Sequence, residues 1–427
     1  MSQSRRRFLK QTALAAGAPM VVPGSVLGKD GQVAPSNRIV LGGVGLGPRG
    51  RKVLTAFLKH KDVQFVAVAD PQTSRREIIR KMASKYHGIE GVQSVPHMET
   101  IFEREDIDAV LIATGERWHA TASILAARSG KDVYSEKPCT MTIAESIELD
   151  DEIRKHKRVF QAGTQRRSVP NFQLAAQLAR SGRLGKLTRL HASIYKMMDD
   201  LPALPEQPLP DADVVDWDRW LGPASERPYN AQYCNGGWRR HTGLSCSWML
   251  LDWGAHTIDL CQWAANKDGT TPVKFEAFSD THLQATYADG LPLVMREGGF
   301  RDEGDWIKGI GTCPVRFEGE EGWVEAGDSG RLEVSDRKLL EGFAPHESLA
   351  GVDPVHHARN FLDCVKSREQ PVCSATVARF GHVAGHAAAL SWKLDRPLEF
   401  DPKTTTFHED DEANRMRRYT RRAPWGI

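Results

Sequence analysis

A glycine-rich string, Val40 to Gly50 (VLGGVGLGPRG), constrains the fold of this chain more than any other feature. Gly45, Gly47 and Gly50 fit the pattern GxGxxG directly after an apolar stretch, which is typical of a turn that joins a strand to a helix. Glycines allow that turn to be tight and let backbone N–H groups approach a pyrophosphate at the helix N-terminus. Two more glycines stand just before the pattern, so its register is uncertain by a residue or two. The string predicts a dinucleotide-binding turn.

Short apolar segments alternate with helical segments from residue 38 onward. We expect strands over 38–41, 65–69, 109–113, 132–135 and 159–162. We expect helices over 52–59, 74–86, 120–128 and 144–155. Continuously apolar strands between helices predict a parallel sheet that is covered on both faces.

The pattern changes after Gln165. A helix is expected over 171–180, a strand over 187–195 and an irregular loop rich in Pro and Asp over 201–213. Strands dominate 273–333, and two helices follow over 356–365 and 376–394. The sequence therefore predicts an α/β protein with an N-terminal Rossmann domain and a C-terminal α/β domain built on a largely antiparallel open sheet. The expected boundaries are 1–35 for a leader and linker, 36–160 and 161–400 for the two domains, and 401–427 for a polar tail.

The first residues carry an export pattern. Ser4 to Lys10 (SRRRFLK), followed by an apolar, small-residue stretch from Ala13 to Gly28, is typical of a twin-arginine signal. We therefore expect a periplasmic or otherwise exported protein that meets the twin-arginine export machinery. That route carries folded proteins, and nucleotide cofactors are scarce outside the cytoplasm. A chain with both patterns is expected to load its cofactor before export and to keep it tightly bound.

Charge and cysteine content exclude several classes of protein. The chain has 57 Lys and Arg against 55 Asp and Glu, a net charge of +2, so no broad cationic field favours nucleic acid or a membrane surface. Its 7 cysteines are widely spaced and lack a CxxC pair, so mostly free, buried thiols are expected rather than a disulfide framework. We also expect a homo-oligomer, either a dimer or a tetramer.

Asp70 ends the second expected strand. A carboxylate at that point can accept hydrogen bonds from the adenosine ribose hydroxyls of a dinucleotide. It favours NAD, because it would repel the 2′-phosphate of NADP. Arg75 and Arg76 lie close by in the sequence and keep NADP open.

Glu136-Lys137-Pro138 follows the strand over 132–135, at the sheet edge where ligands bind in open α/β folds. A lysine there can hydrogen-bond a substrate hydroxyl or carbonyl while its charge stabilises a developing alkoxide. The alternative is a surface lysine that precedes a turn proline.

A second candidate lies between Trp248 and Trp263 (WMLLDWGAHTIDLCQW). In a helix, Asp252, His256 and Asp259 fall at i, i+4 and i+7 on one face. A histidine flanked by carboxylates is a reasonable proton acceptor for a hydroxyl being oxidised. A metal site is an alternative, but no further ligand follows at a recognisable spacing, so no metal is expected. The other alternative is a capped, buried histidine of an apolar helix.

Two more segments are expected near the same crevice. Thr114 to His119 (TGERWH) follows the strand over 109–113, and Trp238 to His241 (WRRH) precedes the helix just described. Trp238 and Arg239 could face a sugar by stacking and hydrogen bonding. Ordinary loop packing is the alternative for both segments.

Over residues 36–400 the chain resembles the Gfo/Idh/MocA family, named for glucose–fructose oxidoreductase, inositol dehydrogenase and MocA. The resemblance rests on the GxGxxG turn, the EKP sequence at 136–138 and the DxGxHxxD pattern at 252–259. The segments ATGERWHA (113–120) and AGTQRRS (162–168) resemble two further family segments. The sequence departs from the family at Gly115 and Glu116, which stand where a Pro-Asp pair is usual.

The resemblance implies roles for particular residues. It implies that Lys137 is the catalytic, substrate-contacting lysine, that His256 is the proton acceptor and that Asp252 is its neighbour. Cofactor-binding positions that follow from the turn, the second strand and the resemblance are Gly45, Leu46, Gly47, Arg49, Gly50, Asp70, Thr114, Trp118, His119, Glu136 and Gln165. Substrate-binding positions are Lys137, Trp238, Arg239, Asp252 and His256.

Three functions are compatible with these features. The first is an exported oxidoreductase that transfers hydride between a sugar or cyclitol carbinol and a tightly bound NAD or NADP. The second is an NAD-dependent glycoside hydrolase that works by transient oxidation and elimination, although such enzymes that resemble this family carry a different histidine segment. The third is a non-catalytic sugar-binding or sensing protein with a vestigial cofactor.

Overall fold

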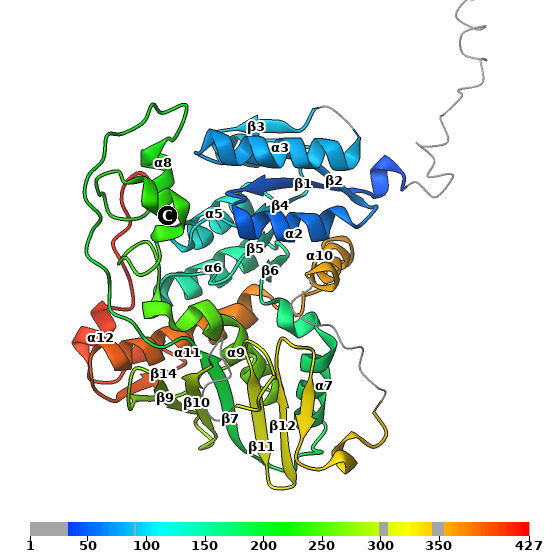
Figure 1. Ribbon diagram of the computed structural model, residues 1–427, viewed down its shortest axis with the longest axis vertical. Helices are drawn as coiled ribbons and strands as arrows, with labels where there is room; N and C mark the ends of the chain where they lie inside the picture. Colours follow the sequence, from blue (N-terminus) through cyan, green and yellow to red (C-terminus); the bar gives the residue numbers. More distant parts are fainter. Residues whose placement is uncertain (1–32, 89–90, 299–305, 344–353, 427) are drawn as a thin grey trace, which may run out of the picture.

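The computed structural model describes residues 33–88, 91–298, 306–343 and 354–426, which form two packed sheet-and-helix units (Figure 1). The expected twin-arginine signal at residues 4–10 lies outside the described residues. The prediction of a Rossmann unit followed by a mainly antiparallel unit is confirmed.

The first unit is a six-stranded parallel sheet with the order β3-β2-β1-β4-β5-β6. Its strands are β1 (Ile39–Val44), β2 (Val63–Ala69), β3 (Gln93–Val95), β4 (Ala109–Ile112), β5 (Asp132–Ser135) and β6 (Phe160–Ala162). Its helices are α2 (Pro48–Leu58), α3 (Thr73–His87), α4 (Glu99–Phe102), α5 (Glu116–Arg128) and α6 (Ile143–Lys155), and a 3-10 turn, η1 (Pro35–Asn37), precedes β1. Strands β4 and β5 are buried along their whole length, as a sheet covered on both faces requires.

Two helices of this unit begin four residues earlier than the sequence predicts. Helix α2 starts at Pro48, because proline has the φ of a first helical residue and lacks the N–H that would be unpaired there. Helix α5 starts at Glu116, after Gly115 in an extended conformation. Glu116, Trp118 and His119 therefore lie in the first turn of a helix and not in a loop.

A late segment of the chain completes the N-terminal unit. Helix α10 (Val355–Ser367) packs against α2, and its Phe361 joins the core that contains Phe57 and Tyr134. The opposite face of the sheet is covered by α4, α5 and α6. The expected boundary between domains at residue 160 stays a prediction. Helix α10 shows that a segment from late in the sequence belongs spatially to the N-terminal unit.

The second unit is a nine-stranded sheet with the order β13-β12-β11-β7-β10-β9-β8-β14-β15. Its strands are β7 (Leu187–Ile194), β8 (Lys274–Ala277), β9 (His282–Thr286), β10 (Pro292–Glu297), β11 (Val315–Gly319), β12 (Gly322–Ala326), β13 (Leu332–Val334), β14 (Leu398–Asp401) and β15 (Thr406–Phe407). All neighbours pair antiparallel except β7 and β10, which are parallel.

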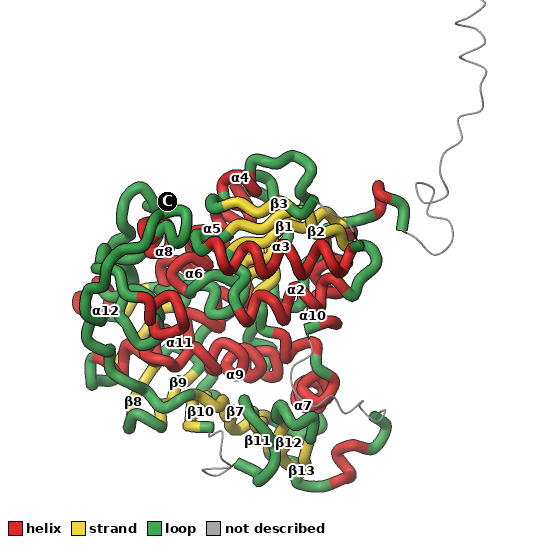
Figure 2. Tube along the Cα trace, turned by 45° about the horizontal axis from the view of Figure 1, so that its top comes forward, coloured by secondary structure: helices red, strands yellow, loops and turns green. Residues whose placement is uncertain are grey.

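Three helices cover one face of this sheet: α7 (Pro170–Arg180), α9 (Leu250–Ala264) and α11 (Ala375–Lys393). Helix α11 also packs against α6, so α9 and α11 lie between the two sheets (Figure 2). Four short elements complete the unit: the 3-10 turns η2 (Gln165–Ser168), η4 (Ser247–Met249) and η5 (Arg337–Leu340), and helix α12 (Asp411–Arg415).

Between β7 and α9 the chain makes a long excursion, residues 195–249, that returns to the N-terminal unit. The part predicted as an irregular loop is mostly exposed, and the short helix α8 (Trp217–Leu221) and the irregular turn η3 (Tyr233–Gly237) follow it. Backbone hydrogen bonds from Thr73 N to Val214 O (3.2 Å) and from Asp216 N to Pro71 O (3.1 Å) join the excursion to the end of β2. Trp217 and Trp220 stack at 4.7 Å and form its own small core.

The C-terminal segment, expected as a polar tail, folds across both units. After α12 it returns to the end of α8 (Figure 1, red). Arg421 pairs with Glu145 (3.3 Å) and Glu148 (2.9 Å) on α6, and the Trp425 ring lies 4.9 Å from that of Trp118. Arg421 thus pairs with two acids on the N-terminal unit, and Arg422 pairs with Asp218 of the excursion, which is why a polar segment packs.

Candidate active site

Two adjoining cavities lie at the carboxyl ends of β1, β2, β4 and β5, where open α/β folds bind ligands. The glycine cavity, of about 410 Å³, is lined by the glycine turn, Asp70 and the excursion. The lysine cavity, of about 270 Å³, is lined by Lys137, Asp252 and His256. Both share the residues Arg49, Ala113, Thr114, Trp238 and Arg239. A ligand that lies along the first can therefore reach into the second.

The structure fixes the register of the glycine turn. Gly45 has φ +65°, and a Cβ there would lie 2.3 Å from Thr114 Cγ2. A Cβ at Gly47 would have Arg75 Nη1, at 3.6 Å, as its nearest described neighbour, so the backbone faces the cavity without obstruction. At Gly50 a Cβ would contact Leu46 and Ala113 at 3.0 and 3.1 Å. These are the three requirements of the GxGxxG turn: a tight bend, close approach of a ligand, and close packing of helix on strand.

Some residues next to the glycine turn pack in the protein core, and others line the cavities. The two glycines before the turn, 42 and 43, lie inside β1, where a Cβ would contact Ile101 at 2.7 Å and Leu46 at 2.6 Å. The Leu46 side chain is buried in the core beneath the turn, where it packs against the helix that follows. Its role as a cofactor contact stays a prediction. The Arg49 side chain lines both cavities.

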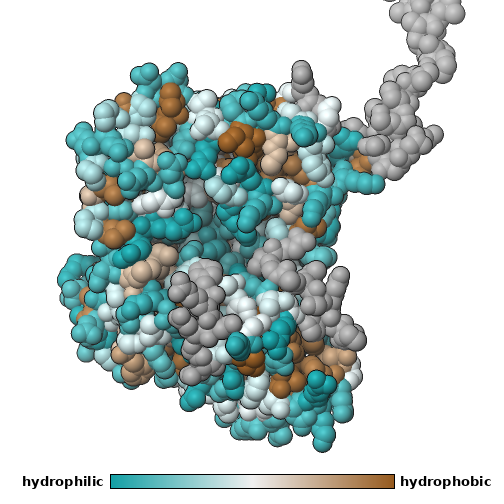
Figure 3. All heavy atoms as spheres, in the orientation of Figure 1, coloured by the Kyte–Doolittle hydropathy of each residue, from teal (hydrophilic) through white to brown (hydrophobic). Residues whose placement is uncertain are grey.

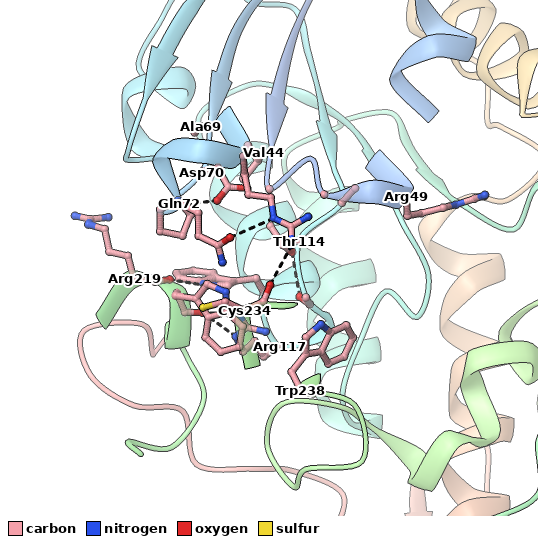
Figure 4. A pocket seen from close by; sticks show the side chains of 18 of the residues that line it. Val44, Arg49, Ala69, Asp70, Gln72, Thr114, Arg117, Arg219, Cys234 and Trp238 are labelled. Atoms are coloured by element: carbon pink, nitrogen blue, oxygen red, sulfur yellow. Dashed lines mark hydrogen bonds between the residues drawn. The ribbon is translucent and has the colours of Figure 1, made fainter. Parts of the chain in front are cut away.

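Asp70 lies at the end of β2 with its carboxylate in the wall of the glycine cavity. It accepts a hydrogen bond from Gln72 N (2.8 Å), and burial raises its pKa to about 6 (Figure 4). Arg76 donates to the backbone carbonyl of Asp70 (2.9 Å). Arg75 donates to Gln72 Oε1 (3.2 Å) and to Cys234 O (3.1 Å). Both arginines therefore have partners other than the Asp70 carboxylate.

Arg117 explains why Gly115 replaces the usual proline. The Arg117 guanidinium lies 3.6 Å from the centre of the Trp220 ring and donates to Trp220 O, and a Cβ on Gly115 would lie 2.2 Å from its Nη1. Burial lowers the pKa of Arg117 to about 9. Among the described atoms, Nη1 is buried without a hydrogen-bond partner beside the glycine cavity. A residue larger than glycine at 115 would displace this guanidinium.

The far wall of the glycine cavity comes from the excursion. Cys234 and Trp238 lie across the cavity from Asp70 and Thr114, and Arg219 lies to one side of them (Figure 4). Trp118 Nε1 donates to Arg219 O (2.9 Å), which ties this wall to α5. The resemblance implies that Trp118 binds the cofactor, and the structure places it along the glycine cavity, not along the lysine cavity.

Lys137 and Asp252 form an ion pair between the two units. The ammonium donates to Asp252 Oδ1 (3.1 Å) and also to the backbone carbonyl of Asp252. Burial alone would raise the pKa of Asp252, but the charges of Lys137, Arg239 and Arg166 lower it below its ordinary value. The carboxylate therefore stays ionised and holds the ammonium at the edge of the lysine cavity.

Glu136 organises the other side of the cavity. Its Oε1 accepts hydrogen bonds from Arg49 Nε (3.0 Å) and Gln165 Nε2 (2.9 Å), and Gln165 also donates to the Tyr134 hydroxyl (2.9 Å). Glu136 and Gln165 are almost fully buried, so this network holds their positions. His119, also in the cavity wall, has its Nδ1 2.6 Å from Pro138 O and its Nε2 3.2 Å from Thr114 O.

His256 faces the lysine cavity as a neutral imidazole. Burial, and then the charges of Arg166, Lys137 and Arg49, lower its pKa well below the usual range. Its Nδ1 is buried and has no hydrogen-bond partner within the described part of the chain. The helix predicted over 248–263 is present as α9, and it brings Asp252 and His256 together at the cavity.

The expectation of two carboxylates flanking this histidine is wrong for Asp259. Arg167, itself buried, takes both Asp259 oxygens through Nε (2.7 Å) and Nη2 (2.8 Å) and also pairs with Asp268 (2.7 Å). Burial raises the pKa of Asp259 to about 6, and Arg167 opposes that shift. Asp259 therefore joins η2 to α9 and lies outside the lysine cavity.

Sequence reasoning did not single out Arg166, and it expected Glu116 near the crevice without giving it a role. Arg166 lines the lysine cavity while Asp328 holds its guanidinium at 2.9 and 2.5 Å; the double arginine of GTQRRS was the available signal. Glu116 lines the same cavity, is 7% exposed and accepts a hydrogen bond from Cys246 N (2.9 Å). Burial raises the pKa of Glu116 to about 7.

Several other features of the described residues bear on the chemistry. No group of three or more His, Cys, Asp or Glu residues that could hold a metal ion occurs among them. No helix in the described ranges is long and apolar enough to cross a membrane. The seven cysteines are free thiols, as expected. The face in Figure 3 is mostly hydrophilic, with hydrophobic residues in small scattered groups.

Comparison with known proteins agrees with this architecture. A model for the Gfo/Idh/MocA oxidoreductases, described as "Oxidoreductase family, NAD-binding Rossmann fold", matches residues 38–164. A second, described as "Oxidoreductase family, C-terminal alpha/beta domain", matches residues 195–319 and 325–427. An oxidoreductase domain protein from Kribbella flavida of known structure has the same fold, with a TM-score of 0.62 at 18% identity over 85% of this chain and 99% of its own.

Three relatives were found by sequence. The rhizopine catabolism protein MocA of Rhizobium meliloti is 33% identical over 70% of this chain and 78% of its own length. Inositol 2-dehydrogenase 4 of Saccharopolyspora erythraea is 31% identical over 44% of this chain, and a glycosyl hydrolase family 109 protein of Solibacter usitatus is 28% identical over 43%. The match spans about half of each of these last two proteins, 55% and 44%. The chain belongs to the Gfo/Idh/MocA oxidoreductase family.

Proposed function

We propose that this family member is an NAD(P)-dependent oxidoreductase that acts on a CH–OH group of a sugar or cyclitol. The observation that carries the proposal is the meeting of the two cavities. The glycine cavity offers a dinucleotide turn, and the lysine cavity, which adjoins it at Thr114, offers a lysine, a carboxylate and a neutral histidine. Two named relatives, MocA and an inositol 2-dehydrogenase, support a cyclitol-like substrate.

The residues of the glycine cavity fit a nicotinamide dinucleotide. The unobstructed backbone at Gly47 and the N-terminus of α2 suit a pyrophosphate. The Asp70 carboxylate suits the adenosine ribose hydroxyls, and Arg117 offers an unpaired N–H. When bound, this group supplies a hydride acceptor and donor. We propose NAD over NADP, because Asp70 would repel a 2′-phosphate and both nearby arginines have other partners.

Lys137 and His256 divide the work on the substrate oxygen. The Lys137 ammonium, held by Asp252, stabilises the alkoxide that forms as the hydroxyl is oxidised. His256 is neutral and can accept the hydroxyl proton. His256→Ala should therefore lower the rate by roughly 10²–10⁴. Trp238 and Arg239, which line both cavities, are proposed to contact the sugar.

Tight retention of the cofactor is proposed from the excursion. It lines the far side of the glycine cavity and is joined to the Rossmann unit by hydrogen bonds just after β2 and on α3 and α5. Release of a bound dinucleotide would require these contacts to open. Protein purified without added nucleotide should carry nicotinamide cofactor after denaturation; an empty supernatant would favour a dehydrogenase with exchanging cofactor.

Export and assembly are proposed from the sequence. The pattern at residues 4–10 supports export of the folded, loaded protein to the periplasm. Replacing Arg5 and Arg6 with Lys should leave the protein with its cofactor in the cytoplasm, and normal export of that variant would contradict the signal. Assembly as a dimer or tetramer stays a prediction, which light scattering tests.

A panel of sugars, cyclitols and aryl glycosides tests the activity itself. With retained cofactor, we expect one substrate to reduce the bound nicotinamide and a second to reoxidise it, which changes nicotinamide absorbance and yields an oxidised and a reduced product. The family 109 relative supports the hydrolase as the second candidate. Release of aglycone without net oxidation or reduction would favour that hydrolase and contradict the oxidoreductase.

A further inference from the structure

Glu116 is a buried carboxyl group in the wall of the lysine cavity for which the proposed roles of Lys137, Asp252 and His256 leave no use. It lies in the first turn of α5 and is 7% exposed. Its Oε2 accepts a hydrogen bond from Cys246 N at 2.9 Å. The same cavity is lined by Lys137, Asp252 and His256, so all four side chains border the space that a substrate would enter.

The chain is bent sharply to place this donor. Ser247, Trp248 and Met249, which directly follow Cys246, all have φ between 45° and 76°. The left-handed region is unfavourable for residues other than glycine, and such strain is found where the surrounding structure demands it. Ser247 Oγ lies 2.7 Å from His386 Nδ1, which anchors the bend on α11. The bend presents the Cys246 amide to Glu116 and starts α9 in the direction that brings Asp252 to the cavity.

The charges that face Glu116 come from every element around it. Burial raises its pKa to about 7, and Asp252 on α9 acts in the same direction. The Cys246 amide, Arg239 of the excursion and Lys137 after β5 oppose the shift. Arg117, on the same helix, also senses the Glu116 charge. The Cys246 thiol stays protonated, because burial and then Glu116 raise its pKa well above the usual range.

His256 is poorly suited to keep a proton. It is fully buried, and three cations, Arg166, Lys137 and Arg49, act against an imidazolium at that position. A proton taken from a substrate hydroxyl is therefore unstable on His256 and favours transfer to a more basic group in the same cavity. Asp252 is unsuited because its carboxylate is held ionised by Lys137. Glu116 is the carboxyl group of this cavity that neither an arginine nor a lysine holds in a described ion pair.

We propose that Glu116 is the group that holds the substrate proton at the end of each oxidation step. This inference rests on the proposed oxidoreductase activity. A bound, oxidised nicotinamide would accept the hydride of the carbinol C–H bond. The substrate O–H bond breaks, and its proton passes through His256 to the Glu116 carboxylate. The products are a carbonyl compound, reduced cofactor and a neutral Glu116 carboxylic acid. Reduction of a second substrate runs the same steps in reverse and leaves Glu116 ionised.

The rates of oxidation and of reduction should depend on pH in opposite directions. Oxidation needs the ionised carboxylate, so its rate rises with pH through about 7 and then levels. Reduction needs the neutral acid, so its rate is level at low pH and falls above about 7. The two half-reactions therefore have opposite pH limbs with a common midpoint, which is the signature of one group that accepts the proton in one half and returns it in the other.

The experiment measures each half-reaction from pH 5.5 to 8.5 in the purified full chain with its nucleotide, by nicotinamide absorbance after rapid mixing. For Glu116→Gln we expect the rate of oxidation at pH 8 to fall by roughly 10²-fold. The rates of both half-reactions should then no longer vary with pH around 7. Glu116→Asp, which restores the family's usual residue, should keep both limbs at a lower rate. Glu145→Gln is the matched control: Glu145 is also buried and accepts from a backbone amide, Met141 N (2.7 Å), but lies outside the cavity. It should keep the wild-type profile.

Infrared difference spectroscopy of the same proteins supplies a readout without turnover. Wild type minus Glu116→Gln should contain one carboxylic acid band that disappears as pH rises through about 7. An unchanged pH dependence of both half-reaction rates in Glu116→Gln, or the absence of that infrared band, would overturn the proposal. If the glutamine variant does not fold, an unchanged rate and midpoint in Glu116→Asp would overturn it. Failure of wild type to reduce nicotinamide with any substrate would refute the proposed function, while the infrared titration still decides whether Glu116 holds a proton.

Discussion

The glycine cavity and the lysine cavity meet at Thr114 but are built in different ways. The floor of the glycine cavity is a contiguous turn that depends on the positive φ of Gly45 and on the absence of a side chain at Gly47. The lysine cavity is built from buried side-chain pairs, such as Lys137 with Asp252, whose members lie 115 positions apart in the sequence. The first geometry is specified locally and the second only by packing. Damage to the two cavities should therefore be separable, as nucleotide loss in one and lost turnover in the other.

The largest expected effect is on the lysine cavity. Lys137→Ala removes the cation that stabilises the substrate oxygen, and turnover should fall by roughly 10²–10⁴. Because Lys137 lines only the lysine cavity, the amount of nucleotide that copurifies should stay near the wild-type value. Lys155→Ala, which removes an exposed lysine paired with Glu152, is the control and should change neither quantity. Loss of nucleotide together with turnover would show that the two cavities are one functional unit.

Gly45→Ala is the corresponding test of the glycine cavity. The new methyl group would lie 2.3 Å from Thr114 Cγ2 at φ +65°, so the turn must shift. Nucleotide content should fall by about tenfold or more, at a strain of about 1–3 kcal/mol in the turn. Gly88→Ala is a close control, since Gly88 has φ +64° but no described atom within 4 Å of a Cβ. Gly88→Ala should lower stability only through the cost of a positive φ at alanine, and it should keep the nucleotide. Equal nucleotide loss in both variants would rule out the steric argument.

The same contrast explains which features the sequence could predict. The Rossmann turn, the end of β2 at Asp70 and the helix that carries Asp252 and His256 follow from local periodicity and motif, and the structure places them as expected. The diversion of Asp259 to Arg167 could not be predicted, because it depends on a buried partner from another segment. The roles of these residues in catalysis stay predictions.

Other features lacked any local signal. The return of α10 to the first sheet, the contact of Trp425 with Trp118 and the bend that brings Cys246 to Glu116 all join segments more than 100 residues apart. Gly115 was a departure from the family pattern whose reason became visible only with the Arg117 guanidinium against it. Composition and spacing specify elements, whereas these contacts depend on which elements pack together.

A third test asks whether the charge of the Asp70 carboxylate sets the affinity of the glycine cavity for NAD. Burial gives Asp70 a pKa of about 6 in the protein without nucleotide, and ribose hydroxyls would hydrogen-bond to its ionised form. NAD affinity should therefore be level above about pH 7 and weaken by about tenfold between pH 7 and pH 5. Asp70→Asn should remove this dependence. Calorimetry on protein stripped of nucleotide measures it, and a wild-type affinity that does not vary from pH 5 to 7 would contradict a contact between Asp70 and the ligand.

Linkage gives the same group an opposite effect on the stability of the nucleotide-free protein. The pKa of Asp70 is raised on folding, so its contribution to the free energy of unfolding is greatest at low pH and is lost as pH rises through about 6. Asp70→Asn should flatten that decline in thermal unfolding experiments. An affinity and a stability that move in opposite directions with pH would identify Asp70 as the shared cause.

The smallest expected effect concerns the wall that the excursion adds to the glycine cavity. Arg219 Nη1 donates to both oxygens of Glu99 at 3.0 Å, its guanidinium lies 5.3 Å from the Trp425 ring, and its backbone carbonyl accepts from Trp118. The ion pair is partly exposed, so it contributes about 1 kcal/mol at most.

Arg219→Ala should speed nucleotide release by about two- to fivefold with unchanged turnover, and the difference should shrink at high salt. Arg80→Ala, which removes a similarly exposed pair with Glu77 on α3, should leave release unchanged. Release measured by fluorescence after dilution decides the matter: equal rates in wild type and Arg219→Ala at low salt would mean that the excursion does not retain the cofactor through this contact, and the glycine turn alone would then have to account for retention.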